Sequence, residues 1–298
     1  MSVRHVNGSG LRHVKRYDNG TASTTVDVDL VGDAEYPVIA VSGSDMLFDT
    51  GSASLAACWN ANLGSSGLVP TGYSQCMTYG TGDIGYTCEL GTGPIEVASV
   101  STNATMCTLT HASLFGGDLF CGWSTGILGA AYSALNVASR GRCGAPHPVS
   151  ANRAFHAPWL DVVTAHGSLE FGIGAREVWI GVSPFIVHDA VDFELKRAGA
   201  SYYMIRDFAS GVQYILDTGT PITCVAECDQ TLYITNARGQ RVSFHGFDRT
   251  FPSNLVVHGH RLLGYPALRQ HIVQFAPFAT SDHLPHVSFG DVSVSVGR

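Results

Sequence analysis

The sequence predicts a β-rich chain with few, short helices. Of its 298 residues, 34 are glycine and only 14% are charged, and no long stretch has the 3.6-residue apolar period of an amphipathic helix. Residues 25–30 and 287–296 instead alternate apolar and polar side chains, which is typical of half-buried strands, and residues 95–100 and 104–109 indicate further strands. The length allows one large domain or two lobes.

The charge balance argues against nucleic acid as a partner, because the formal net charge is −7. Residues 1–16 hold four basic residues and no acidic one, so they carry +4 and the remainder carries −11. An acidic body loses repulsive charge as its carboxylates protonate, so we expect it to tolerate acid. No apolar run reaches 18 residues, which predicts no membrane span.

Eight cysteines and three Asn-x-Ser/Thr sequons indicate an oxidising, secretory environment. The sequons begin at Asn7, Asn19 and Asn103. The first five residues lack the apolar core of a signal peptide, so either a signal was trimmed from this chain, which we expect, or the protein is not exported. The prediction is a disulfide-bonded glycoprotein that is secreted or resides in an acidic endomembrane compartment.

One seven-residue pattern occurs twice. Residues 46–52 read Met-Leu-Phe-Asp-Thr-Gly-Ser, and residues 214–220 read Tyr-Ile-Leu-Asp-Thr-Gly-Thr. In both copies an apolar run, typical of a buried strand, leads into Asp-Thr-Gly, where glycine allows a sharp turn. A single Asp-Thr-Gly arises by chance in roughly one chain in fifteen of this length. Two copies in the same setting therefore favour a shared role over two ordinary turns.

The two aspartates of this pattern, Asp49 and Asp217, suit acid–base chemistry at one centre. Two close carboxylates cannot both ionise cheaply, so one keeps a proton while the other stays charged. The charged one can take a proton from a water between them, and the protonated one can donate to a carbonyl oxygen. The pair titrates as a unit, so the sequence does not assign acid and base. Neighbouring hydroxyl and amide groups can orient the carboxylates: Thr50, Gly51, Thr218 and Gly219.

With these motifs the chain resembles the pepsin-like aspartic endopeptidases. Residues 77–82, Met-Thr-Tyr-Gly-Thr-Gly, resemble the tip of that family's flap hairpin. Residues 125–132 and 262–264 resemble the two segments whose apolar-apolar-glycine triplets support the two aspartates. The order along the chain (Asp, flap, triplet, Asp, triplet) is also the family's, and the resemblance spans residues 24–275.

The resemblance implies an all-β, bilobal pepsin-like fold with a cleft between the lobes. It implies a flexible basic leader or prosegment remnant over residues 1–23, an N-terminal lobe over 24–178 and a shortened C-terminal lobe over 179–298. The catalytic residues would be Asp49 and Asp217, supported by Thr50, Gly51, Ser52, Thr218, Gly219 and Thr220. The substrate would contact Tyr79, Gly80 and Thr81 on the flap, and Leu47 and Ile127 beside the aspartates.

Three features depart from the family's pattern. Ala56 stands where the family usually has a tryptophan that holds the flap tyrosine, and Trp59 follows three residues later. Tyr265 follows the second triplet, where family members commonly have aspartate. Only 45 residues separate Asp217 from Leu262, against 78 between Asp49 and Ile127, so the second lobe is shortened. The primed side of the cleft is therefore expected to be reduced or remodelled.

The cysteine pairing stays open in the sequence, because eight cysteines allow 105 full pairings. Cys76 and Cys88 bracket the flap, and a turn near Gly82 would bring them side by side, so we predict a cross-strand disulfide between them. Cys224 and Cys228 suggest zinc only weakly, because no four-ligand spacing accompanies them. We expect no metal site.

The predicted function is an aspartic endopeptidase with no metal or organic cofactor. Asp49 and Asp217 would activate a water at acidic pH, with hydrophobic residues preferred on both sides of the scissile bond. The expected partners are peptide or protein substrates and statine-type peptide inhibitors. Both motifs lie in one chain, so we expect a monomer, made as a zymogen if residues 1–23 cover the cleft. The alternatives are a catalytically silent binding protein on the same scaffold and an unrelated β-protein whose aspartates hold a hard cation.

Overall fold

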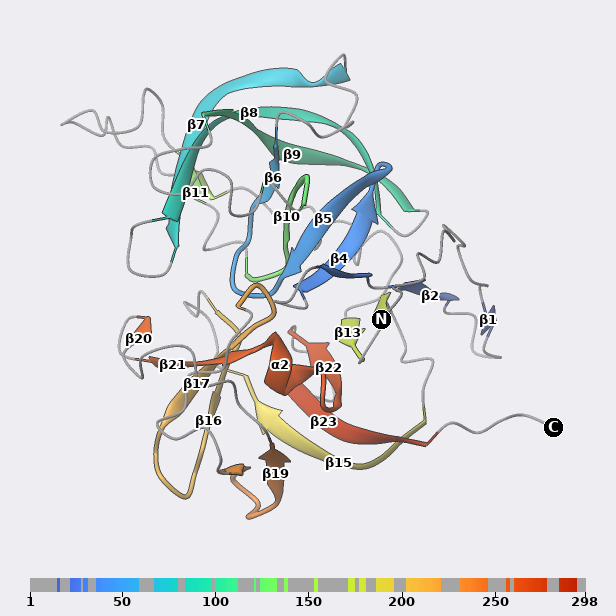
Figure 1. Ribbon diagram of the computed structural model, residues 1–298, viewed down its shortest axis with the longest axis vertical. Helices are drawn as coiled ribbons and strands as arrows, with labels where there is room; N and C mark the ends of the chain where they lie inside the picture. The colour runs from blue at the N-terminus through green and yellow to red at the C-terminus, as the bar shows by residue number, and fades with distance from the viewer. Residues whose placement is uncertain are drawn as a thin grey trace, which may run out of the picture.

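The computed structural model describes residues 15–16, 22–27, 29–31, 36–58, 67–79, 84–97, 100–111, 121, 124–132, 137–138, 153–154, 171–174, 177–180, 186–195, 202–220, 231–245, 256–257, 260–277 and 284–293. Most of these residues lie in strands, and the only α-helix among them is α2, Tyr265–Leu268 (Figure 1). The predicted all-β class with few short helices is confirmed.

An eight-stranded sheet is built from the first half of the chain and fills the upper part of Figure 1. Its strands lie in the order β3-β4-β5-β10-β6-β9-β8-β7. Their bounds are β3 Asp29–Val31, β4 Tyr36–Val41, β5 Ser44–Asp49, β6 Leu55–Ala57, β7 Val69–Tyr79, β8 Ile84–Val97, β9 Val100–His111 and β10 Gly126–Gly129.

A seven-stranded sheet combines strands from both halves of the chain in the order β1-β2-β14-β13-β22-β23-β15. Its bounds are β1 Lys15–Arg16, β2 Ala22–Asp27, β13 Phe171–Ile173, β14 Glu177–Ile180, β15 Ile186–Glu194, β22 Ile272–Ala276 and β23 His286–Ser293. A four-stranded sheet, β16-β17-β21-β20, holds Met204–Arg206, Gln213–Asp217, His260–Gly264 and Val256–Val257. Two pairs remain: β11 Val137–Ala138 with β12 Arg153–Ala154, and β18 Leu232–Thr235 with β19 Arg241–Phe244.

The same three-strand unit occurs in both halves. β4 pairs antiparallel with β5, which pairs parallel with β10; β16 pairs antiparallel with β17, which pairs parallel with β21. The registers also correspond. Leu47 and Ile215 each stand two residues before the aspartate that ends their strand, and they lie opposite Val38 and Met204. The repeated sequence pattern therefore marks a repeated structural unit.

Buried aromatic rings join the two units through the seven-stranded sheet. Phe171 of β13 stacks on Phe275 of β22 with ring centroids 4.7 Å apart, and it meets Phe48 of β5 edge-on at 6.0 Å. Tyr203, just before β16, lies 5.2 Å from Phe275. Fully burying a ring of this kind contributes about 1.5–3 kcal/mol, so this shared core holds the two aspartate-bearing strands in one body.

The structure differs from the sequence-based prediction at two strands. Lys15 and Arg16, placed in the flexible leader, form β1 and pair with Ser23 and Ala22 of β2. The strand predicted over residues 95–100 is a hairpin, because β8 ends at Val97 and pairs there with the first residue of β9. The sequence pattern continues across residues 98 and 99, so periodicity alone does not reveal that the chain reverses. In the described part of the chain, no helix has the length and hydrophobicity needed to cross a membrane.

Candidate active site

The two aspartates occupy equivalent strand ends. Asp49 is the last residue of β5 and Asp217 the last residue of β17. Beside each runs a parallel strand that ends in the glycine of a predicted triplet, with Gly129 opposite Asp49 and Gly264 opposite Asp217. Because parallel neighbours end at the same edge of a sheet, each carboxylate lies where its turn leaves the sheet.

The turn after Asp49 is fixed by the segment that follows β10. The amides of Gly129, Ala130 and Ala131 donate to backbone carbonyls between residues 49 and 54, at 2.8, 2.7 and 2.7 Å. A Cβ atom on Gly129 would lie 2.4 Å from the amide nitrogen of Ser54, so only glycine allows this approach. In the second half the Tyr265 amide donates to the Thr220 carbonyl at 2.9 Å in the same manner.

Crossed hydrogen bonds join the two motifs through their threonines. The Thr50 amide donates to the Thr218 hydroxyl at 2.9 Å, and the Thr218 amide donates to the Thr50 hydroxyl at 3.0 Å. The hydroxyls donate onward to the opposite strands, Thr50 to the Leu216 carbonyl at 2.8 Å and Thr218 to the Phe48 carbonyl at 2.6 Å. Both threonines are fully buried, so these four bonds hold the two turns against each other in a medium of low dielectric.

Each carboxylate lies against the glycine of the opposite motif. A Cβ atom added to Gly51 would lie 2.5 Å from Cγ of Asp217, and one added to Gly219 would lie 2.5 Å from Oδ1 of Asp49. Any other residue would push the carboxylates away. The glycine amides also orient the carboxylates, Gly51 donating to Asp49 at 2.7 Å and Gly219 to Asp217 at 2.9 Å.

The protonation of the pair follows from its burial. Asp49 is buried and Asp217 is half-buried. Burial, the charge of Asp49 and a hydrogen bond to Asp49 raise the pKa of Asp217, hydrogen bonds from Thr220 and Gly219 lower it, and the net result is a pKa of about 8. With its pKa so high, Asp217 keeps a proton at acidic and neutral pH. The two carboxyl groups therefore share a proton, as a pair this close must.

The hydroxyl residues that follow the two motifs behave differently. Thr220 donates its hydroxyl to Oδ2 of Asp217 at 2.6 Å, as the sequence predicts. The hydroxyl of Ser52 is buried and makes no hydrogen bond in the described structure, so its predicted bond to Asp49 is absent. Serine lacks the second γ substituent that restricts χ1 of threonine, so its hydroxyl is held less firmly toward the carboxylate.

Apolar side chains lie beside each aspartate. Leu47 and Ile127, predicted to contact substrate, are paired across β5 and β10 and are both 4% exposed. The second half has a matching pair, Ile215 and Leu262, across β17 and β21. Leu262 stands in the predicted triplet, and Ile215 is an apolar residue that the duplicated pattern could have assigned to the site.

Two tyrosines near the Asp49–Asp217 dyad were not identified as site residues from the sequence. Burial, and after it the charge of Asp217, raises the pKa of Tyr36. Burial, and after it the charges of Asp217 and Asp49, raises the pKa of Tyr202. The two hold equivalent places, two residues before Val38 and Met204. A tyrosine at or just before the start of each strand that precedes an aspartate strand is the signal that could have found them.

The predicted flap is a β-hairpin. Tyr79 ends β7 and lies opposite Ile84, the first residue of β8, which leaves a four-residue connection. Gly80 and Thr81 lie in that connection, which is outside the described residues. Trp59, which follows β6, is also outside the described residues. Ala56, at the place of the family's tryptophan, is fully buried in β6, between Ile127 of β10 and Cys107 of β9.

The predicted Cys76–Cys88 disulfide is wrong, because Cys88 is bonded to Cys107. In the hairpin Cys76 lies opposite Thr87 and Cys88 opposite Gln75, one residue away from the pairing that would join the two cysteines. A shift of one residue puts side chains on opposite faces of a sheet; Cys88 is buried, whereas Cys76 is exposed and belongs to another disulfide.

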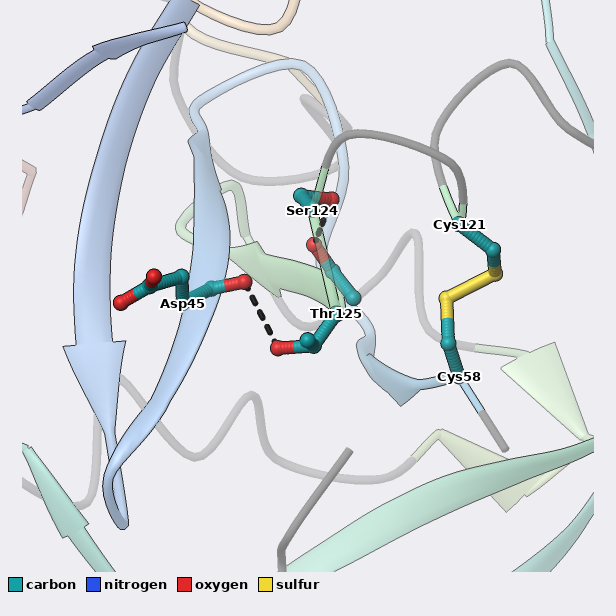
Figure 2. Close-up of a disulfide and its surroundings, with 6 residues drawn as sticks. Asp45, Cys58, Cys121, Ser124 and Thr125 are labelled. Atoms are coloured by element: carbon teal, nitrogen blue, oxygen red, sulfur yellow. Dashed lines mark hydrogen bonds between the residues drawn. A yellow bond between two sulfur atoms is a disulfide. The ribbon is translucent and has the colours of Figure 1, made fainter. Parts of the chain in front are cut away.

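A second disulfide, Cys58–Cys121, joins the end of β6 to the segment before β10 (Figure 2). Beside it, the hydroxyl of Thr125 donates to the Asp45 carbonyl at 2.7 Å (Figure 2). The Thr125 amide donates to the same carbonyl at 2.7 Å, and the Cys58 amide donates to the Thr125 carbonyl at 2.8 Å. The hydrogen bonds of Thr125 hold the segment that leads into β10 and Ile127. Within the described residues, no three His, Cys, Asp or Glu side chains converge as a metal site would require; Cys224 and Cys228 lie outside those residues.

Comparison with solved structures identifies the fold as that of an aspartic proteinase. The crystal structure of the aspartic proteinase from Irpex lacteus matches with a TM-score of 0.65 at 16% identity, over 92% of this chain and 99% of that chain. No protein-family model and no curated protein matches the sequence. The likeness therefore rests on structure and agrees with the fold that the motifs predict.

Proposed function

We propose that the protein is an aspartic endopeptidase. The observation that carries the proposal is the carboxylate pair itself: Asp49 and Asp217 end equivalent strands, lie against each other's glycines and are fixed by crossed threonine bonds. Aspartic proteases are the standard example of two carboxylates that share a proton. The aspartic proteinase fold supports the same reaction class.

The reaction follows from the protonation of the pair. Asp49, ionised, takes a proton from a water held between the carboxylates, and the water oxygen attacks the peptide carbonyl carbon. Asp217 gives its proton to the carbonyl oxygen, so the tetrahedral intermediate carries no full negative charge there. Collapse of the intermediate breaks the C–N bond, the amine leaves with a proton, and the pair returns to one shared proton. The chemistry needs no metal.

The apolar residues beside the dyad support a preference for hydrophobic side chains flanking the scissile bond. Leu47 and Ile127 serve one side and Ile215 and Leu262 the other, with the β7–β8 hairpin excluding water above them. We further propose two lobes divided near residue 178, an acidic pH optimum, and a monomer that takes peptide or protein substrates. Secretion or an acidic endomembrane compartment agrees with the disulfides.

Peptide-library cleavage followed by mass spectrometry between pH 3 and 7 tests the proposal. Wild type should cleave, Asp217→Ala should not, and Asp45→Ala, exposed on the same strand as Asp49, should cleave as wild type does. Binding of a statine-type peptide, which imitates the tetrahedral intermediate, should exceed that of its deoxy analogue at least 100-fold. Folded protein that cleaves nothing and binds both peptides equally would support the silent binding protein instead.

A further inference from the structure

The β7–β8 hairpin leaves the eight-stranded sheet just beyond Cys88, because Thr87, opposite His111, makes the last pair with β9. From Val97 back to Cys88, β8 pairs regularly with β9, and the register shifts between Thr87 and Cys88. Beyond that point the residues from Tyr86 back to Ile84 pair only with β7 among the described strands. β7 is the edge strand and pairs with β8 alone. Cys88 therefore stands at the root of a two-stranded arm whose end carries Tyr79.

A covalent bond lies at this root. Cys88 is joined to Cys107 of β9, and both are at most 1% exposed. Cys107 lies opposite Leu90 on β8 and Cys88 opposite Leu109 on β9, so the disulfide crosses the two strands diagonally at the last regular pair. The bond therefore restrains the position where the arm would otherwise bend.

The same cysteine connects the arm to the strand of Asp49. Cys107 lies opposite Ala56 of β6, Ala56 lies opposite Ile127 of β10, and Ile127 lies opposite Leu47 of β5, two residues before Asp49. The strands β5, β10, β6 and β9 thus run side by side from Asp49 to Cys107, and the disulfide joins β9 to β8, the strand that leads into the arm. Figure 1 shows β6, β10 and β5 between the β8–β9 ribbon and the second half of the chain.

The side chains around the disulfide pack as one cluster. Ala56, Tyr86, Leu90 and Leu109 surround the two cysteines, and Met77 of β7 packs against them. Met77 and Tyr86 lie opposite each other in the arm itself, so its lower part rests on the disulfide. The small side chain of Ala56 leaves the room that the bridge occupies.

We propose that the Cys88–Cys107 disulfide is a positioning pair that fixes the base of the β7–β8 arm, the hairpin assigned above to cover the substrate. The inference deepens the proposed endopeptidase function and rests on it for the identity of the substrate. Without the bond the arm would pivot at the register shift between Thr87 and Cys88. The arm would then cover a bound peptide for a smaller fraction of the time. The cysteines do not touch substrate and act through the arm alone.

Amide hydrogen exchange of the wild-type protein tests whether the disulfide anchors the arm, and the measurement does not depend on catalytic activity. The amides of Ile84–Tyr86 on the arm should exchange at least about tenfold faster than those of Leu90–Val97, with the change at Thr87 and Cys88. In Cys88→Ala/Cys107→Ala the difference should grow by a further factor of about ten. Cys88→Val/Cys107→Ala, which restores part of the lost volume, is the second variant if the first does not fold. A boundary between fast and slow exchange elsewhere along β8 would refute the proposal that the disulfide anchors the arm. Exchange on the arm that stays unchanged in the folded variant would refute it as well.

The matched control is Cys58→Ala/Cys121→Ala, which removes the other bridge in the same buried cluster. That bridge spans 63 residues against 19, so its loss should lower the melting temperature more. Yet kcat/KM and statine affinity should fall about tenfold or more only in Cys88→Ala/Cys107→Ala. Equal losses in both variants, or none in either, would refute the positioning role. A wild type that cleaves nothing would refute the function, while the exchange data still decide the anchor.

Discussion

Replacing Asp217 with asparagine should make the protein more stable than wild type at neutral pH. In the folded protein, burial and the Asp49 charge raise the pKa of Asp217 from 3.8 to about 8. A raised pKa means that the protonated form stabilises the fold fully below about pH 4 and that this contribution is lost as the pH rises through about 8. Asparagine resembles the protonated acid and has no proton to lose, so its contribution should not change with pH.

The magnitude follows from the size of the shift. A pKa rise of about four, at 1.36 kcal/mol for each pH unit, corresponds to about 5 kcal/mol between pH 4 and 8. Asp217 is only half-buried, and water screens part of the penalty, so we expect about 2–4 kcal/mol. Set against a typical unfolding free energy of about 5–15 kcal/mol, this is a large share of the stability.

Urea unfolding of wild type and Asp217→Asn between pH 4 and 8 measures this difference. The free energies of unfolding should agree near pH 4 and diverge as the pH rises, with the variant the more stable. Asp45→Asn, exposed on strand β5, is the control and should follow wild type at every pH. Parallel curves for wild type and Asp217→Asn would show that Asp217 is not held protonated by its surroundings.

Three further predictions follow from single contacts. Thr218→Val removes the buried hydroxyl that donates to the Phe48 carbonyl and accepts from the Thr50 amide, and it should cost about 2–4 kcal/mol in urea unfolding, whereas Thr218→Ser keeps the hydroxyl and should cost under about 1 kcal/mol. Gly219→Ala places a Cβ atom 2.5 Å from Oδ1 of Asp49 and should lower kcat/KM about 100-fold, whereas Gly67→Ala, with nothing within 4 Å, should not. Burial would raise the pKa of Asp207, but hydrogen bonds from Ser210, Thr235 and Ala209 outweigh it and lower the pKa. Asp207→Asn should therefore cost about 1–3 kcal/mol at pH 7, a difference lost as the pH falls through this lowered pKa.

The centre of the site could be predicted because it is encoded locally and twice. An apolar run before Asp-Thr-Gly places Asp49 and Asp217 at strand ends, and the triplets at Ile127 and Leu262 supply the parallel neighbours. Each of these needs only a few adjacent residues. The duplication then implied that the two ends meet.

Features that depend on register or on distant partners could not be predicted. The partner of Cys88 follows from a pairing offset of one residue in the hairpin and a register shift beside β9, and neither has a sequence signal. Thr50 and Thr218 were expected to orient their own carboxylates, yet they bond across 168 residues to each other. The charges of the aspartates act on Tyr36 and Tyr202 because β4, which begins at Tyr36, and β16, which follows Tyr202, pair with the two aspartate-bearing strands.

The most direct test of the central claim is whether the two carboxylates act as one catalytic unit. We would measure kcat/KM on one peptide selected from the library for wild type, Asp49→Asn, Asp217→Asn and the double variant. Each single change should lower kcat/KM at least about 1,000-fold, and the double variant should be no worse than either single one, because a shared-proton pair is lost when one member is lost. Losses that add on a free-energy scale, or a single variant that keeps wild-type activity, would contradict catalysis by Asp49 and Asp217 as a pair.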